Sequence, residues 1–143
     1  MTIIGVDLGA KGGWVALDSG GNVIDHTKGS GIMSCHNATI YVEKPLKNRK
    51  GTHVRALTAM HDAYGYFRGQ MDARHIEYIP VEYHEWARVM LGGGKYPAAM
   101  RCRELWPDNP EIAGHEGLAD ASLIAEYGRR LLIQNSDGSA PAR

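Results

Sequence analysis

Four acidic residues stand at positions where carboxylates are uncommon. Asp7 ends the first apolar run of the chain, and Glu43 ends the most apolar run. Glu116 and Asp120 are four residues apart, so a helix would place them on one face, in a segment otherwise rich in alanine and leucine. Two carboxylates about 4 Å apart repel each other by about 4 kcal/mol at an effective dielectric constant of about 20, so a cluster of four takes up protons or binds cations. Oxygen ligands of this kind suit Mg²⁺ or Mn²⁺, and paired ions stabilise the attacking and leaving oxygens of phosphodiester hydrolysis.

Each of these residues also has a structural explanation when it is taken alone. Asp7 is followed by glycines and could form a turn, and Glu43 could reach solvent at a strand end. Glu116 suits the N-terminus of a helix, where negative charge is stabilised. Asp120 lies a full turn further along and is harder to explain in this way. The combination therefore favours a catalytic metal site with these four residues as its ligands.

The basic residues are concentrated in the middle of the chain. Sixteen basic and sixteen acidic residues cancel overall, but residues 44–103 hold eleven lysines and arginines against five acids. A charge run of this kind is usually a solvated loop, whereas bases beside a metal site would contact phosphates and make binding salt-dependent. Nothing in the sequence indicates sequence-specific reading of bases. The residues expected to contact nucleic-acid phosphates are Lys44, Lys47, Arg49, Lys50 and Arg55.

A mixed sheet flanked by helices would position these residues. Runs of β-branched and apolar residues predict strands over residues 2–8, 14–17, 22–24, 38–43 and 76–81. Apolar residues three or four apart predict helices over residues 54–71, 86–91, 98–106 and 118–132. The turn sequence Asp18-Ser19-Gly20-Gly21 favours a hairpin, so the first three strands should form an antiparallel meander. We expect an α/β fold of about five strands with the first and fourth adjacent, as one domain over residues 1–134 with a disordered tail over residues 135–143.

Further expectations concern the helices and the tryptophans. Gly65 and Gly69 lie within the long helix over residues 54–71 and would allow it to pack closely against the sheet. Arg129 and Arg130 suit the negative end of a helix dipole and would mark the end of the last helix. The tryptophans are expected in the core rather than as stacking platforms: Trp14, Trp86 and Trp106.

Several other classes of protein are disfavoured. No apolar run approaches the roughly 20 residues that a membrane span requires, so no membrane association is expected. Cys35 and Cys102 are far apart, which predicts reduced thiols and a cytoplasmic location. The segment Gly92-Gly93-Gly94-Lys95 lacks the strand-to-helix frame of a phosphate-binding loop, so nucleotide binding is not expected there. No small-molecule substrate is expected either.

Three segments that carry the acidic residues resemble the motifs of the ribonuclease H-like nucleases. They are Ile4-Gly5-Val6-Asp7-Leu8-Gly9, Tyr41-Val42-Glu43-Lys44 and His115-Glu116-Gly117-Leu118-Ala119-Asp120-Ala121. In order and spacing the chain most resembles RuvC-type Holliday junction resolvases, particularly the compact phage branch, from residue 2 to about residue 132. The resemblance implies a ribonuclease H-like fold and a homodimeric endonuclease that nicks two strands of a four-way DNA junction symmetrically. It also implies two Mg²⁺ ions per active site, for which Mn²⁺ substitutes.

The resemblance also suggests roles for individual residues. The acids that match the family pattern are Asp7, Glu43 and Asp120. The family commonly has an aspartate or a histidine three residues before the last aspartate, where this chain has Gly117. Glu116 and His115 are the nearby alternatives, and we expect Glu116 as the fourth ligand because it shares the helix face of Asp120.

One basic residue and one apolar residue complete the comparison with the family. Lys95 resembles a family lysine near the active site, which would steady the scissile phosphate or the developing charge. The family tends to have an aromatic residue that probes the junction just after the second acid. This chain has Leu46 there, so base stacking is not expected at that position.

Two other functions remain open. A nuclease resembling the bacterial pre-ribosomal RNA processing group would share the fold and the first motif but would cut structured RNA. That group does not typically end its fourth strand in a Val-Glu-Lys pattern. A catalytically silent nucleic-acid-binding module would keep the fold without cleavage, and the intact acids argue against it. Cleavage of branched DNA or structured RNA, with and without Mg²⁺, would separate the three.

Overall fold

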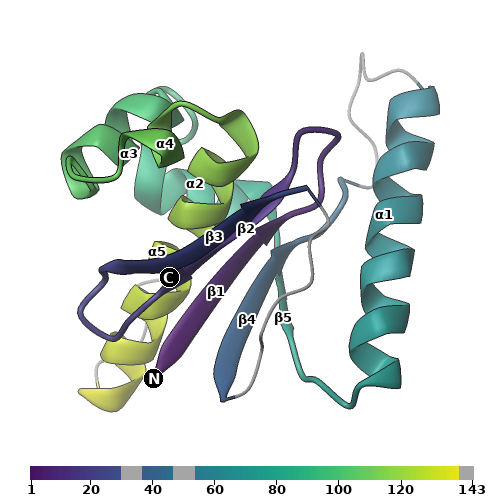
Figure 1. Cartoon of the computed structure of the whole chain (residues 1–143), viewed down its shortest axis with the longest axis horizontal. Helices are drawn as coiled ribbons and strands as arrows, with labels where there is room; N and C mark the ends of the chain where they lie inside the picture. Colours follow the sequence, from purple (N-terminus) through teal and green to yellow (C-terminus); the bar gives the residue numbers. More distant parts are fainter. Residues whose placement is uncertain (30–36, 47–53, 139–143) are drawn as a thin grey trace.

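A mixed β-sheet forms the centre of the molecule (Figure 1). The computed structural model of the chain describes residues 1–29, 37–46 and 54–138. Within this part the strands are β1 (Thr2–Asp7), β2 (Gly13–Leu17), β3 (Val23–Lys28), β4 (Ala38–Glu43) and β5 (Ile79–Val81). Their order across the sheet is β3-β2-β1-β4-β5, with antiparallel pairing from β3 to β1 and parallel pairing from β1 to β5. The predicted α/β class, the meander and the adjacency of the first and fourth strands are confirmed.

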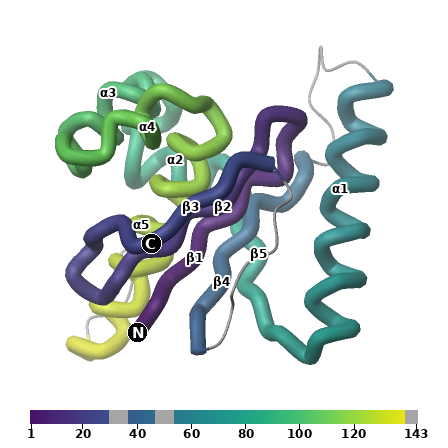
Figure 2. The backbone as a smooth tube through the Cα atoms, viewed as in Figure 1, coloured from purple at the N-terminus to yellow at the C-terminus, as the bar shows by residue number. Residues whose placement is uncertain are grey.

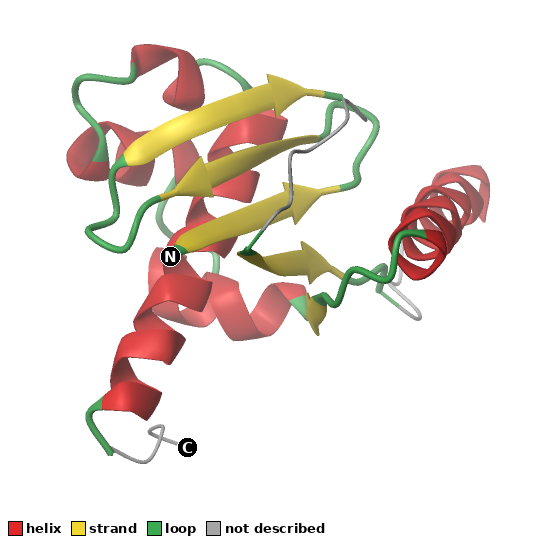
Figure 3. Cartoon of the chain, turned by 60° about the horizontal axis from the view of Figure 1, so that its bottom comes forward, coloured by secondary structure: helices red, strands yellow, loops and turns green. Residues whose placement is uncertain are grey.

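Helices lie on both faces of the sheet. They are α1 (Val54–Ala73), α2 (Tyr83–Leu91), α3 (Ala98–Leu105), α4 (Pro110–Ala113) and α5 (Glu116–Ser136). The helices α2 to α5 gather on one face, whereas α1 stands apart from them across the sheet (Figure 3). In the described part of the chain, no helix is both long and apolar enough to cross a membrane.

The alternation of side chains along β1 divides the core into two parts. Ile3 points to the face covered by α5 and joins the larger core, while Ile4 and Val6 point to the opposite face and join the smaller core. The smaller core reaches α1 only through Phe67 and Met71 among its fully buried residues. The face with α5 therefore holds most of the buried apolar surface.

The helix α5 lies directly on β1 at Gly5. A Cβ atom at this position would lie 2.0 Å from the carbonyl oxygen of Ala121 and 2.4 Å from the amide nitrogen of Ala125. Only glycine permits this approach, because any other residue would push the helix away from the strand. The contact fixes the position of α5 relative to the end of β1.

The apolar stripe predicted for the long helix is only partly buried. Phe67 and Met71 are buried, but Val54 at the other end is 77% exposed. The expectation that Gly65 and Gly69 pack against the sheet is wrong, because no atom lies within 4 Å of a Cβ built at either position. At 100° per residue these glycines lie on the side of α1 opposite Phe67 and Met71, so they face outward.

Several element boundaries differ from the sequence prediction. The third strand continues to Lys28, because its backbone pairs with β2 as far as Gly13. The fifth strand is shorter than predicted and begins only at Ile79, and the short helix α4 was not predicted. The last helix extends to Ser136, two residues into the segment expected as a tail, and residues 139–143 lie outside the described residues.

The two arginines expected at the end of the last helix lie inside it instead. Glu126 is 4% exposed and accepts hydrogen bonds from Arg129 Nε at 2.7 Å and Arg130 Nε at 2.8 Å. Burial raises the pKa of Glu126, but the bonds from both arginines outweigh it and hold the pKa below its usual value. Arg129 also donates to the carbonyl oxygen of Ser19 at 3.2 Å, which ties α5 to the turn between β2 and β3.

The tryptophans lie in the core as predicted: Trp14, Trp86 and Trp106 are buried. Trp106 Nε1 also donates to the carbonyl oxygen of Gly21 at 2.8 Å. The Cys102 thiol is free and buried beside Ser122, and burial raises its pKa to about 11. Cys102 therefore stays a protonated core thiol, and Cys35 lies outside the described residues.

The close contact at Gly5 can be tested with a pair of identical substitutions. Gly5→Ala should lower the free energy of unfolding by about 3 kcal/mol or more, because the new methyl group overlaps the Ala121 carbonyl. Gly65→Ala is the control and should raise that free energy by up to about 1 kcal/mol, since it meets no atom and alanine favours the helix. Urea unfolding measures both values. A Gly5→Ala chain as stable as the wild type would disprove the contact.

Candidate active site

Asp7 and Glu43 end two neighbouring parallel strands. The strands β1 and β4 run side by side (Figure 2). Their register pairs Val6 with Val42, one residue before each acid. Neighbouring strands lie about 4.8 Å apart, so the two acids leave the sheet side by side. The alternation along each strand directs both toward the face that α5 covers, since Gly5 and Tyr41 also face α5.

The N-terminal part of α5 brings the other two acids to the same edge. Glu116 is the first residue of α5, and Asp120 immediately precedes Ala121, which lies on Gly5. The charges of Asp7 and Glu116 both raise the pKa of Asp120, and the charges of Asp7 and Asp120 both raise the pKa of Glu43. The four predicted ligands are therefore close enough to repel one another.

Burial adds to this repulsion. Burial is the largest cause that raises the pKa of Glu43 to about 7, ahead of the lowering effect of a hydrogen bond from Trp86. Burial also raises the pKa of Asp120 to about 7 and raises the pKa of Asp7 above its usual value. For Asp7 the hydrogen bond from the Gly9 amide opposes the shift, and the charge of Glu116 adds to it.

No lysine, arginine or histidine forms an ion pair with these carboxylates within residues 1–29, 37–46 and 54–138, although the charge of His115 lowers the pKa of Asp7. Other acids there have basic partners: Glu82 pairs with Lys44, Glu104 with Arg101, and Glu126 with two arginines. None of the ion pairs in these ranges includes Asp7, Glu43, Glu116 or Asp120. Four oxygen-bearing acids without an ion-pair partner in these ranges fit a divalent cation of the Mg²⁺ type.

The ligating geometry is not preassembled. Among the described residues, no three acidic, histidine or cysteine side chains already stand as a group that could hold a metal ion. Asp7 Oδ1 accepts a hydrogen bond from the Gly9 amide, with an N···O distance of 2.8 Å. Oδ2 stays available to a cation. A bound ion would therefore have to draw the remaining carboxylates together by rotation of their side chains.

Asp7 lies between two hollows of the surface. One is a small cleft that Asp7 shares with Glu43 and Lys44. The other has a volume of about 280 Å³ and is shared with Lys11 and Glu116. Asp7 is thus the carboxylate with access to both sides of the site.

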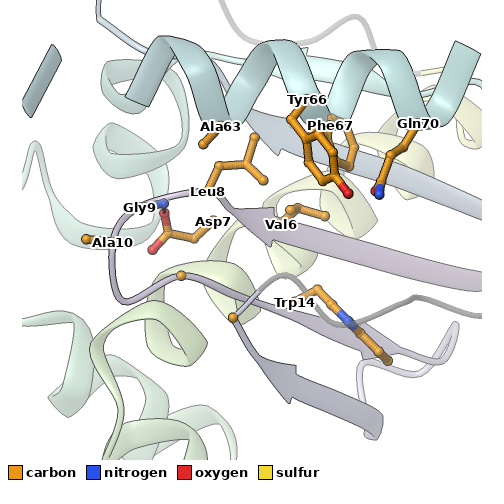
Figure 4. Close-up of a pocket in the computed structure, with 12 residues that line it drawn as sticks. Val6, Asp7, Leu8, Gly9, Ala10, Trp14, Ala63, Tyr66, Phe67 and Gln70 are labelled. Atoms are coloured by element: carbon orange, nitrogen blue, oxygen red, sulfur yellow. Dashed lines mark hydrogen bonds between the residues drawn. The ribbon is translucent and has the colours of Figure 1, made fainter. Parts of the chain in front are cut away.

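A larger cavity of about 310 Å³ lies between β1 and α1 (Figure 4). Asp7 stands at one end of it, and its walls are mostly apolar, with Trp14 and Phe67 among them. Tyr66 lines the same cavity and is 65% exposed. This cavity contributes no ligand beyond Asp7, so the polar part of the site lies on the side of α5.

The surroundings of Gly117 bear on the choice between Glu116 and His115 as the predicted fourth ligand. A Cβ atom at Gly117 would lie 1.8 Å from the carbonyl oxygen of Lys11, so no side chain fits there. His115 caps α5, with Nδ1 accepting the Leu118 amide proton at 3.2 Å. A neutral imidazole has one acceptor nitrogen, so this cap leaves His115 without a lone pair for a metal. Both observations favour Glu116, which stays a prediction.

The predicted DNA-binding residues are only partly described. Lys44 is partly exposed and pairs with Glu82 at 3.3 Å, and Arg55 is exposed in the first turn of α1. The other three, Lys47, Arg49 and Lys50, lie outside the described residues.

Lys95 has no contact with the four acids in the described part of the chain. It is exposed in the loop between α2 and α3 and forms no ion pair or side-chain hydrogen bond in the part of the chain that is described. The preceding Gly94 lies against Tyr83, since a Cβ there would be 2.9 Å from the Tyr83 hydroxyl. A role for Lys95 near the phosphate remains a prediction.

Two residues of the site escaped the sequence analysis. Lys11 lines the hollow that holds Asp7 and Glu116, and the only signal for it was a base four residues after Asp7. Trp86 Nε1 donates to Glu43 Oε2 at 2.7 Å. The sequence predicted Trp86 as a core residue, and no local pattern could reveal a bond across 43 residues of chain.

Comparisons with known proteins identify the fold. No protein-family model and no curated protein sequence matches the chain. Among solved structures, Thermus thermophilus RuvC in complex with a Holliday junction substrate matches with a TM-score of 0.64 at 13% identity. Another Thermus thermophilus RuvC structure matches with a TM-score of 0.52 at 16% identity. Each match covers 98% of both chains, so this chain has the ribonuclease H-like fold of RuvC.

The raised pKa values predict how stability depends on pH in the absence of metal. Between about pH 4.5 and pH 7 the folded chain keeps protons on Glu43 and Asp120, whose pKa values are raised to about 7, while the unfolded chain has lost them. Stability should therefore fall as pH rises through this range. In a chelating buffer we expect the melting temperature to decrease by about 3 °C or more between about pH 5 and pH 8.

A neutral variant isolates the contribution of one carboxylate. Glu43→Gln should flatten the pH profile and raise the melting temperature at about pH 8, because the amide carries no charge yet still accepts the Trp86 hydrogen bond. Glu77→Gln, at an exposed position, should reproduce the wild-type profile. If Glu43→Gln and Glu77→Gln gave the same profile, the proposed repulsion would be absent.

Proposed function

We propose that this chain is a Mg²⁺-dependent endonuclease that cuts branched DNA, four-way junctions first. The observation that carries the proposal is the group of four carboxylates, none of which forms an ion pair with a described residue, at one edge of a ribonuclease H-like sheet. The substrate class is supported by the likeness to Thermus thermophilus RuvC, which was solved with a Holliday junction substrate. Cleavage is hydrolysis of a phosphodiester bond, as expected for a crossover junction endodeoxyribonuclease.

The proposed ligands of two Mg²⁺ ions are Asp7, Glu43, Glu116 and Asp120. Bound ions would stabilise negative charge on the attacking and leaving oxygens, and Mn²⁺ would substitute for Mg²⁺. Asp7, which borders both hollows, is the natural ligand to be shared between the ions. Lys95 is proposed to steady the scissile phosphate.

Basic residues around this edge would bind the DNA backbone. Lys44 borders the cleft with Glu43, and Lys11 borders the hollow with Glu116. Arg55 would extend this surface, together with Lys47, Arg49 and Lys50 of the same basic segment. Contacts to phosphates position the DNA and do not read its sequence, so selectivity would come from the branched shape.

We also propose that the active form is a homodimer. The outward side of α1 supports this, because it combines the exposed apolar residue Val54 with the uncovered Gly65 and Gly69. Small residues on a helix allow a second helix to approach closely. Two copies would carry two sites, one for each strand that is nicked in a symmetric resolution.

The experiment that tests the proposed function is cleavage of a DNA and RNA panel. The chain is incubated with four-way, three-way, flap and linear DNA and with a structured RNA, with and without Mg²⁺. Wild-type chain should nick the four-way junction symmetrically and only with Mg²⁺. Asp7→Asn should slow cleavage by about 10³-fold or more, because it removes a charged ligand whose effect amounts to several kcal/mol. It should leave junction binding intact, since local repulsion of phosphate is reduced.

The control variant is Asp108→Asn, which changes an exposed aspartate in the turn between α3 and α4 and should cut at the wild-type rate. Sedimentation of the bound junction reports whether two chains bind. Full cleavage by Asp7→Asn would contradict the assignment of the site. Preferred cleavage of structured RNA would support the RNA-processing alternative, and binding without any Mg²⁺-dependent cleavage would support the silent module.

A further inference from the structure

Trp86 holds one oxygen of Glu43. The indole Nε1 donates a hydrogen bond of 2.7 Å to Glu43 Oε2, and Trp86 is fully buried, with an exposed fraction of 0%. A hydrogen bond to a carboxylate is among the stronger ones in proteins, because the acceptor is charged. Oε1 accepts no hydrogen bond from any described residue, so the two oxygens of Glu43 are not equivalent.

The surroundings make Trp86 a rigid support. The ring of Tyr83 packs edge-on against it, with centroids 5.3 Å apart and planes at 83°. A single residue, Glu82, separates β5 from α2. A capping box between Glu82 and Glu85 fixes the first turn of α2. The backbone of Lys44, directly after Glu43, donates to the Val81 carbonyl oxygen at 2.8 Å. Both partners of the Glu43–Trp86 bond are therefore attached to the same strand pair.

The bond limits how Glu43 can approach a cation. Ca²⁺ commonly takes both oxygens of a carboxylate in a flexible shell, whereas Mg²⁺ demands a near-octahedral shell with short distances. With Oε2 engaged by Trp86, Oε1 is the oxygen that remains for an ion. Burial of the indole keeps Glu43 from turning both oxygens to the same side, because that rotation would leave the Nε1–H group buried without an acceptor.

We propose that Trp86 is a positioning residue that presents Glu43 as a ligand through one oxygen, and that it thereby favours Mg²⁺ over Ca²⁺ at this site. The inference rests on the proposed function, because it takes Glu43 as a metal ligand. Groups that orient a ligand typically contribute a factor of about 10 to 100 in metal affinity.

The test measures binding of Mg²⁺ and of Ca²⁺ separately by calorimetry, on wild type and on Trp86→Phe. Trp86→Phe keeps an aromatic ring but removes the donor. Mg²⁺ affinity should fall by about tenfold or more, while Ca²⁺ affinity should fall less, so the Mg²⁺ to Ca²⁺ affinity ratio decreases by roughly tenfold. A general loosening of the fold would weaken both ions alike and leave the ratio unchanged.

Trp106→Phe is the matched control. It also removes a buried indole bond, to the Gly21 carbonyl oxygen, but between elements that hold none of the four acids. Its affinity ratio should equal that of the wild type. An unchanged ratio in folded Trp86→Phe would overturn the inference while leaving the nuclease proposal intact. Absence of any Mg²⁺ binding to the wild type would instead overturn the proposed function.

A measurement on the wild-type chain keeps the test valid if Trp86→Phe does not fold. In a nitrogen-15 correlation spectrum, the indole proton of Trp86 should shift when Mg²⁺ is added, because its acceptor becomes a metal ligand. The indole proton of Trp106, which bonds a backbone carbonyl, should not move. A Trp86 indole proton whose chemical shift stays unchanged at saturating Mg²⁺ would contradict the proposal.

Discussion

The geometry of the site depends on how closely α5 lies on β1. At Gly5 the helix backbone touches the strand backbone, with a virtual Cβ only 2.0 Å from the Ala121 carbonyl oxygen. This approach buries the apolar side of α5 from Leu118 to Ala125 in the larger core. It also brings Asp120, next to Ala121 in sequence, to the edge where β1 ends in Asp7. A side chain at Gly5 would move Asp120 on α5 away from Asp7 at the end of β1. The same close contact therefore determines both the packing of the helix and the geometry of the candidate site.

Buried carboxylates occur in two contrasting environments in this molecule. Glu126 is buried with two arginines of the same helix bonded to it, which lowers its pKa, and one of them, Arg129, also donates to the Ser19 carbonyl oxygen in the turn between β2 and β3. Asp7, Glu43 and Asp120 are partly buried and form no ion pair in the described ranges, and burial together with the neighbouring carboxylates raises the pKa of each. A buried carboxylate without a partner costs stability, so its presence in a cluster indicates a binding requirement. A divalent cation would supply the missing positive charge.

Local sequence patterns predicted the sheet well and the contacts between distant elements poorly. The strand over 38–43 has the predicted bounds, and the meander follows from turn chemistry at Asp18–Gly21, because both depend on neighbouring residues. The outward orientation of Gly65 was not predicted, since periodicity alone does not show which part of an apolar stripe meets the sheet. The Trp86–Glu43 bond depends on where α2 crosses the strand ends, which is a property of the tertiary fold.

The same distinction applies to the candidate site. Asp7 and Glu43 were found because carboxylates are rare at strand ends, and in the structure the charge of Asp7 acts on both Glu43 and Asp120. The preference for Glu116 over His115 came from helix spacing, and the structure adds support that the sequence could not give: the cap that His115 forms and the Lys11 carbonyl beside Gly117. Lys95 was chosen by resemblance, and no contact in the described part of the chain links it to the acids.

The most direct test of the central claim, that these carboxylates form a cation site, is the number of protons released when Mg²⁺ binds. Calorimetric titration at about pH 6.5 in two buffers of different ionisation enthalpy measures it. Because the pKa values of Glu43 and Asp120 are raised to about 7, both are largely protonated at that pH and must lose protons to become ligands. We predict release of about one proton or more per chain, decreasing toward zero above about pH 8.5. Binding heats that do not depend on the buffer, or no binding at all, would contradict the account.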